Sequence, residues 1–201
     1  MTSSSRELIL DRIRAALRDA PIVGEVPREY RPAGTDSADL DVLIDRLVDY
    51  KAEVYRVSAG EVAATAARLA GEGGAVLVPP GLPMEWRPEG ALTDDGLAPD
   101  RIASAGAVLT AAAVAVAETG TIVLDASPDQ GRRIITLLPD VHVCVLRPDQ
   151  VVASVPDAIA RLDPRRPLTW ISGPSATSDI ELNRVEGVHG PRHLHVLILD
   201  S

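Results

Sequence analysis

The chain has 201 residues, enough for one domain with a real hydrophobic core or for one domain with a short appendage. Its formal net charge of −9 argues against a nucleic-acid-binding surface, because such surfaces need clustered Lys and Arg. Local basic sites remain at Arg132-Arg133 and Arg165-Arg166. Apolar residues make up 46% of the chain but aromatic residues only 2%, so we expect an aliphatic core of the kind that suits a sheet covered by helices.

Cys144 is the single cysteine, so no internal disulfide can form and no four-thiolate iron–sulfur cluster can be held. The first residues are polar and charged and lack the apolar centre of a signal peptide. No apolar run reaches the roughly 20 residues that span a bilayer. We therefore expect a cytoplasmic protein with no membrane span and no iron–sulfur cluster of its own.

The N-terminal residues predict a helical arm. Ser4 and Glu7 form a capping box before apolar residues at helical spacing, and Pro21 stops that helix. Residues 21–36 are rich in Pro and Gly and read as a linker. We thus divide the chain into a helix and linker at 1–34 and a single α/β domain at 35–201. The apolar stripe of the helix is expected to pack on its own domain, with docking on a partner as the alternative.

A strand–helix–strand unit opens the domain. An amphipathic helix is predicted over 40–48, a short strand over 54–57, and a helix from the capping box of Ser58 and Glu61 to Gly71. A buried strand follows at 75–78. Crossovers of this kind join parallel strands, so the unit indicates a mainly parallel sheet flanked by helices. Trp86, in the loose segment that follows, is expected to anchor that segment by packing.

The most apolar segment, 105–124, is interrupted by Glu118-Thr119-Gly120-Thr121. Residues 111–117 fit either a helix or a strand of small residues, and 122–124 reads as a strand. A carboxylate beside an apolar run is expected to be partly desolvated, which suits acid–base or nucleophilic chemistry. Glu118 is therefore the candidate catalytic residue, and acceptance of backbone N–H bonds at a turn is the alternative.

Residues 125–140 form a polar excursion before a strand over 141–146. His142 and Cys144 share one face of that strand and are expected to be core residues. A helix beginning at Ser154 is expected to turn Val155, Ile159 and Leu162 inward. The final strand is predicted over 194–199.

His193 and His195 share a face of the final strand. No carboxylate or further histidine stands at a tight ligand spacing from them, so we expect no metal site. Walker loops, G-x-G-x-x-G and G-x-S-x-G are also missing, which leaves nucleotide and serine-hydrolase functions without support.

A strand over 168–171 runs into a loop of glycine, proline and hydroxyl residues. Ser178 and Glu181 then have the spacing of a capped helix start, so the loop is either a simple helix cap or a cradle of N–H groups for an anion. Acidic residues in that first turn count against a phosphate. The predicted substrate-binding residues, from this loop and from the turn beside Glu118, are Thr119, Gly120, Thr121, Gly173, Ser175, Thr177 and Ser178.

The combination of these motifs resembles the lactate-utilisation protein C family, also called the LUD domain family. The resemblance spans about residues 100–200, and the earlier helices and strands fit it. The residues that carry it are the strand around His142, Ala117-Glu118-Thr119-Gly120-Thr121, Ser172-Gly173-Pro174-Ser175, Ser178-Asp179-Ile180-Glu181 and Gly187-Val188-His189-Gly190-Pro191.

The resemblance implies an α/β fold like that of ribose-5-phosphate isomerase, glucosamine-6-phosphate deaminase and CoA-transferases. It also implies a role in bacterial oxidation of L-lactate to pyruvate with separate iron–sulfur subunits as partners. CoA-transferases use a glutamate nucleophile, a role that Glu118 matches only by residue type. The ligand would be a small carboxylate or phosphate, and no further cofactor is indicated.

Two other functions stay open at this point. The chain could be a non-catalytic assembly or regulatory subunit of the same system, with the N-terminal helix used for docking. It could also be an isomerase- or ligase-like enzyme that acts on a small phosphorylated metabolite.

Overall fold

The computed structural model describes residues 4–18, 26–34, 37–174, 176–177, 185–186 and 190–200. It divides into two compact units, Met1–Arg31 and Pro32–Ser201. The first unit contains the helix α1, Ser5–Ala16, with the predicted capping box: the Ser4 hydroxyl accepts the Glu7 N–H, and the Glu7 carboxylate accepts the Ser4 N–H. None of the residues of α1 is buried.

The second unit is built on a six-stranded sheet in which every pairing is parallel, as predicted. The strand order is β1-β12-β7-β4-β2-β3. The strands are β1 (Glu53–Val57), β2 (Val76–Val78), β3 (Leu92–Thr93), β4 (Ala107–Thr110), β7 (Val141–Leu146) and β12 (His193–Leu199).

The last strand lies inside this sheet and not at its edge. In the register of β12, His195 lies beside Glu53 of β1 and Leu199 beside Val57, while His193 lies beside Val141 of β7 on the other side. The first strand of the domain is therefore joined to the rest of the sheet through the last one.

A second sheet of four strands has the order β8-β5-β6-β9 and is mainly antiparallel. Its strands are β5 (Val114–Val116), β6 (Thr121–Leu124), β8 (Val151–Val152) and β9 (Thr169–Ile171). The strand predicted over 168–171 is thus present, but it does not belong to the parallel sheet. Beyond it, the short strands β10 (Ala176–Thr177) and β11 (Val185–Glu186) pair with each other, and the predicted helix start at Ser178 lies outside the described residues.

Helices cover both sheets. The α-helices of the second unit are α2 (Leu40–Asp49), α3 (Val62–Leu69), α4 (Pro99–Ala103) and α5 (Val155–Arg161). Short 3-10 helices are η1 (Ala59–Glu61), η2 (Met84–Trp86), η3 (Arg133–Thr136) and η4 (Pro148–Gln150). None of the helices in the described ranges is long and apolar enough to cross a membrane.

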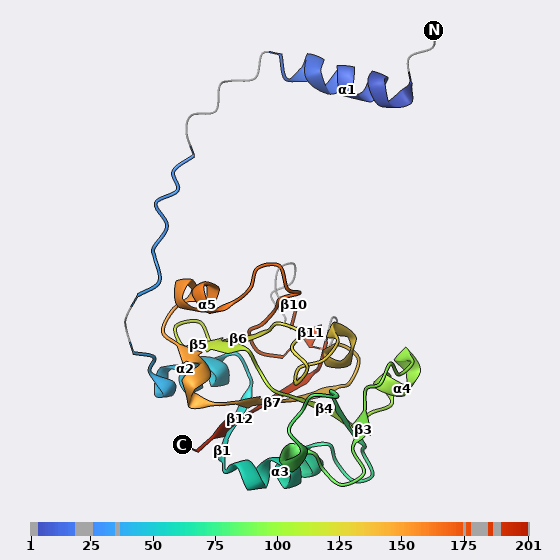
Figure 1. The fold of residues 1–201 in the computed structure, drawn as a ribbon, viewed down its shortest axis with the longest axis vertical. Helices are drawn as coiled ribbons and strands as arrows, with labels where there is room; N and C mark the ends of the chain where they lie inside the picture. Colours follow the sequence, from blue (N-terminus) through green and yellow to red (C-terminus); the bar gives the residue numbers. More distant parts are fainter. Residues whose placement is uncertain are drawn as a thin grey trace. The chain divides into compact units, whose positions relative to one another are not determined.

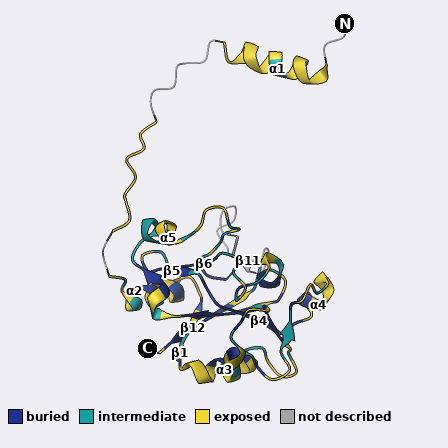
Figure 2. Ribbon diagram, in the orientation of Figure 1, coloured by how far each residue is buried: buried dark blue, intermediate teal, exposed yellow. Residues whose placement is uncertain are grey.

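The layers follow from the alternation of side chains along the strands. Val143 and Val145 face α3, whereas Cys144 and Leu146 face a core shared with α2 and the second sheet. Figure 1 shows α3 on one side of the parallel sheet, with α2, β5 and β6 on the other. The outer face of the second sheet packs on α5. In Figure 2 the strands are mostly dark blue, the colour of buried residues.

Most predicted elements of the domain are confirmed, with one side chain misplaced. The capping box of Ser58 and Glu61 is present, Trp86 is packed in the core at 5% exposure, and His142 and Cys144 are buried. Residues 111–113 turn out to be a connection before β5. Ile159 was predicted to face inward, which is wrong: it is 60% exposed, because α5 buries Ala158 on its inner side instead.

Two turns from distant parts of the chain press against α2. Gly120, with a φ of +61°, closes the β5–β6 turn so tightly that a Cβ there would lie 2.7 Å from the Cβ of Arg46. Gly173, with a φ of +82°, follows β9, and a Cβ there would lie 2.3 Å from the carbonyl oxygen of Tyr50. Arg46 and Tyr50 are one helical turn apart. Both glycines are therefore required for close packing on the same helix.

Replacement of Gly120 by Ala should destabilise the domain by more than about 2 kcal/mol, because the new methyl group meets main chain and not a flexible side-chain end. Gly90→Ala is the matched control: Gly90 has a similar φ of +71° but nothing within 4 Å, so only the strain of about 1 kcal/mol is expected. Urea unfolding of the two variants measures the difference. Equal destabilisation would contradict the role assigned to packing on α2.

Candidate functional site

The topology of the parallel sheet indicates where a ligand would bind. From β2 the chain continues outward to β3, whereas from β4 it continues in the opposite direction to β7 and β12. The strand order therefore reverses between β2 and β4. In open α/β sheets, ligands bind outside the carboxyl ends of the strands at such a switch point.

Three segments meet at that point. Residues 79–81 follow β2, residues 111–113 follow β4, and residues 125–131 follow β6 of the second sheet. The N–H of Gly81 donates to the carbonyl of Pro128 at 2.9 Å, and the N–H of Ala111 donates to the carbonyl of Asp129 at 3.0 Å. A Cβ at Gly81 would lie 2.4 Å from Pro128, so only glycine allows this approach. The polar excursion is thereby fixed across the ends of β2 and β4.

A cavity of about 470 Å³ lies here, and we call it the strand-edge cavity. Its volume is in the range of sites for small molecules. Its polar and charged lining residues are Asp125, Ser127, Asp129, Gln130, Arg147, Gln150 and Arg161.

Two buried glutamines hold the cavity walls. The Gln130 side-chain carbonyl accepts the N–H of Asp125 at 2.6 Å. The Gln150 side chain accepts the N–H of Arg147 at 2.9 Å and donates to the carbonyl of Ala112 at 2.6 Å. These bonds satisfy the buried carbonyl of Ala112 and the partly buried N–H groups of Asp125 and Arg147, so they hold the loops in place.

The two carboxyl groups of the cavity differ in their surroundings. Asp125 forms an ion pair with Arg166 at 3.2 Å and accepts the N–H of Ser127. Asp129 has one carboxyl oxygen, Oδ1, that is buried without a hydrogen-bond partner in the described part of the chain. Burial raises the pKa of Asp129, against the opposing effect of the nearby Arg147. The raised pKa and the unpartnered oxygen make Asp129 the candidate proton-exchanging group of the cavity.

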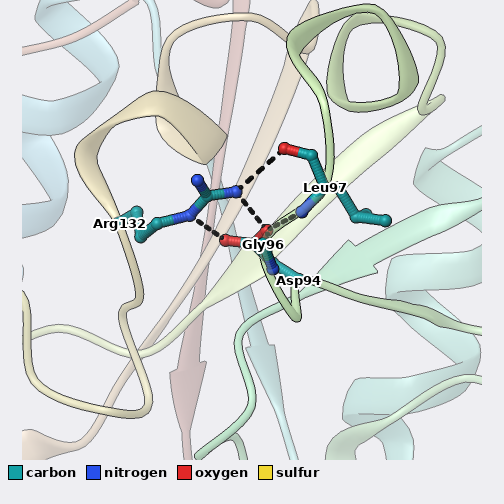
Figure 3. Close-up of polar contacts among 4 residues, drawn as sticks. All are labelled: Asp94, Gly96, Leu97 and Arg132. Atoms are coloured by element: carbon teal, nitrogen blue, oxygen red, sulfur yellow. Dashed lines mark hydrogen bonds and ion pairs between the residues drawn. The ribbon is translucent and has the colours of Figure 1, made fainter.

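A bidentate ion pair holds the far side of the excursion (Figure 3). Arg132 donates from Nε to one carboxylate oxygen of Asp94 at 2.8 Å and from a terminal nitrogen to the other oxygen. The same Asp94 carboxylate accepts the N–H groups of Gly96 and Leu97. The side chain of Asp94 is 1% exposed, and its hydrogen bonds with Arg132 lower its pKa. The excursion is in this way tied to the segment after β3.

Glu118 lies elsewhere and is exposed. Its carboxylate accepts the N–H of Val155 at 3.0 Å, at the first residue of α5, where an acidic side chain is favourable. The expected desolvation of this carboxylate is not found, because the β5–β6 turn that carries it reaches the surface.

The predicted binding residues that the structure describes do meet. The hydroxyl of Thr119 donates to that of Thr121 at 2.8 Å, and the Thr121 hydroxyl lies 2.8 Å from that of Ser172, next to Gly173. This hydroxyl chain lies at the opposite end of β5 and β6 from the strand-edge cavity, which begins at Val114 and Asp125. Ser175 and Ser178, and the side chain of Thr177, lie outside the described residues.

Sequence reasoning missed Asp129, Arg147, Gln130 and Gln150. The signal that could have found the first of these was the polar excursion directly after a buried strand. Nothing local marked the glutamines, because their partners are remote in the sequence.

The remaining chemically active side chains are held in the core. The Thr110 hydroxyl lies 2.9 Å from Nε2 of His142, and burial lowers the pKa of His142 to about 4. Burial also raises the pKa of Cys144 to about 12. Within the described ranges, no group of three His, Cys, Asp or Glu side chains is placed to hold a metal ion.

Arg132→Met should lower the midpoint of urea unfolding at pH 7, because it leaves the buried Asp94 carboxylate without its cation. The folded-state pKa of Asp94 is lowered, so this stabilisation is present above the unfolded pKa of about 3.9 and is lost as the pH falls through the folded value. The gap between wild type and variant should therefore close below about pH 4. Arg56→Met, which breaks only an exposed pair with Asp41, is the control. A gap that does not change with pH would exclude the ion pair as its source.

Known proteins resemble this chain in sequence and in fold. A protein of Deinococcus radiodurans named lactate utilization protein C is 49% identical over 162 residues, which cover 77% of this chain and 76% of that protein. The lactate utilization protein C of Bacillus licheniformis is 30% identical, and that match covers 58% of this chain and half of the Bacillus protein. The crystal structure of a DUF162 family protein from Deinococcus radiodurans superposes with a TM-score of 0.68 at 41% identity, covering 80% of this chain and 96% of that one. Residues 40–199 match the LUD domain, and the chain belongs to the LUD domain family.

Proposed function

We propose that this chain is a cytoplasmic component of a bacterial L-lactate utilisation system that oxidises L-lactate to pyruvate together with separate iron–sulfur subunits. The observation that carries the proposal is the 49% identity, over 77% of the chain, to a protein named lactate utilization protein C. A polar cavity at the switch point of the parallel sheet supports it, because this is where a small metabolite would bind.

The single cysteine of the chain supports the proposal that separate partner subunits carry the iron–sulfur clusters. Oxidation of lactate releases two electrons, which iron–sulfur clusters can accept one at a time. Cys144 is fully buried, and burial raises the pKa of its thiol to about 12, so it is unsuited to act as a thiolate ligand. We therefore place the clusters on partner chains and the binding of the small carboxylate on this one.

Reconstitution with the iron–sulfur subunits tests the proposal. L-lactate oxidation, followed by pyruvate formation, is expected only when this chain is present. Glu118→Gln is the informative variant, because an amide can still accept the Val155 N–H but cannot take up a proton. A fall in turnover with α5 intact would support the predicted catalytic role of Glu118, and unchanged turnover would leave it the role of a helix cap. Full oxidation without this chain would refute the proposal.

An assembly role is the second candidate, and α1 is the observation that favours it. The first unit by itself does not bury Leu8, Ile9 and Ile13 of this helix, which are 51%, 58% and 49% exposed. Exposed apolar side chains at helical spacing are typical of a surface that docks into a groove of another protein.

The variant Ile9→Ser/Ile13→Ser should reduce co-purification of the iron–sulfur subunits several-fold if α1 docks on them, since it removes apolar side chains of α1 and leaves the sequence of the α/β domain unchanged. Arg14→Ser, on the same helix, is the matched control and should have little effect, because its pair with Asp11 is exposed. Undiminished co-purification with the double variant would argue against docking through α1. Thermal unfolding of the variants checks that the domain is unchanged.

A further inference from the structure

The strand-edge cavity contains a carboxyl group that lacks the partners its neighbour has. Asp125 is neutralised by Arg166 and bonded to the Ser127 N–H. Asp129 forms no ion pair in the described part of the chain, and its Oδ1 is buried without a hydrogen-bond partner. A charged carboxylate in this position is costly, and protonation is the usual way in which such a group lowers the cost.

A protonated Asp129 has a different chemistry from a charged one. Its O–H donates a hydrogen bond, so it can contact an acceptor that a carboxylate would repel. The charged groups that act on it are Arg147, which favours the ionised form, and Asp125, which opposes it. Burial raises the pKa of Asp129 and exceeds the lowering effects of Arg147 and of hydrogen bonds with its own backbone and with Gln130.

The lining of the cavity also contains positive charge. Arg147 and Arg161 both line the cavity. The pair between Arg147 and Asp149 is 3.6 Å long, and Asp149 is 77% exposed, so solvent screens this pair. Among the described residues, the guanidinium of Arg161 forms one hydrogen bond, to the carbonyl of Asp149. Arg147 and Arg161 are therefore available to pair with an anion in the cavity, because neither forms an ion pair with a buried carboxylate of the described residues.

We propose that the strand-edge cavity binds a small monocarboxylate, whose carboxylate pairs with Arg147 and accepts a hydrogen bond from protonated Asp129. This inference rests on the proposed function, which supplies L-lactate and pyruvate as the ligands to test. The cavity, at about 470 Å³, is larger than a three-carbon acid requires, so longer 2-hydroxy acids fit the same site.

The arrangement couples binding to protonation. A carboxylate beside Asp129 favours the protonated form of that residue, so the ligand and a proton bind together. At a pH near the pKa of Asp129, the binding of one ligand molecule is therefore accompanied by the uptake of up to one proton from the buffer.

Isothermal titration calorimetry of the full-length protein measures both effects. L-lactate and pyruvate are titrated at several pH values, each in two amine or sulfonate buffers that differ in ionisation enthalpy, which gives the number of protons taken up. Binding with net proton uptake is expected for the wild type. Asp129→Asn keeps a donor but cannot titrate, so it should bind without proton uptake.

Arg147→Gln should weaken binding about tenfold or more, the usual effect of losing one charge-assisted hydrogen bond. The loop itself should keep its shape, because Gln150 holds the backbone of Arg147 and not its side chain. Arg165→Gln is the matched control: Arg165 is 89% exposed, pairs with Asp163 and does not line the cavity, so binding should be unchanged.

The outcomes separate this inference from the proposed function. The inference would be overturned if Arg147→Gln and Asp129→Asn changed neither the affinity nor the proton uptake, because the ligand would then lie elsewhere. Lactate oxidation by the reconstituted system would be unaffected by that result. The monocarboxylate class would be overturned if the protein bound inorganic phosphate but neither L-lactate nor pyruvate, and if Arg147→Gln abolished the phosphate binding. If this chain bound the carboxylates but the reconstituted system did not oxidise lactate, the proposed function alone would be refuted.

Discussion

Burial of the parallel sheet on both faces is the constraint that shapes the rest of this domain. One face of β7 packs on α3, and the other packs on α2 and the second sheet, so its side chains on both faces must be apolar or internally satisfied. His142 meets this requirement as a neutral ring beside Thr110. Polar and charged side chains gather beyond the carboxyl ends of β2 and β4, where they line the strand-edge cavity.

The second sheet gives those groups a fixed arrangement. Its strands β5 and β6 lie between β4 and β7 in the sequence, whereas β8 and β9 follow β7. The strand β6 leads directly into the excursion that crosses the strand ends. The amide of Gln130 and one bidentate ion pair hold that excursion, so bonds within the protein fix its conformation. Such preorganisation reduces the entropy lost on binding, which is what a weakly interacting small metabolite needs.

Secondary-structure elements were predicted well from the sequence, and their arrangement within the sheets less well. Periodicity and capping boxes located α2, β1, α3 and β7, because those signals act within a few residues. The strand order was not readable, since pairing of β12 with β1 joins residues from the two ends of the domain. The predicted turn beside Glu118 and the loop at Gly173 do meet, but their glycines serve contact with α2. The cavity itself could not be foreseen, because five separate segments of the chain, between residues 81 and 162, form it.

The central place of β12 has a consequence for synthesis of the protein. A ribosome makes β1, β2, β3, β4 and β7 before β12, so until then β1 has no neighbour in the sheet and β7 has an open edge. Unpaired strand edges rich in valine and leucine are templates for pairing with other chains. The nascent domain is therefore most prone to aggregate just before its last strand emerges, and chaperones that cover strand edges would matter most at that stage.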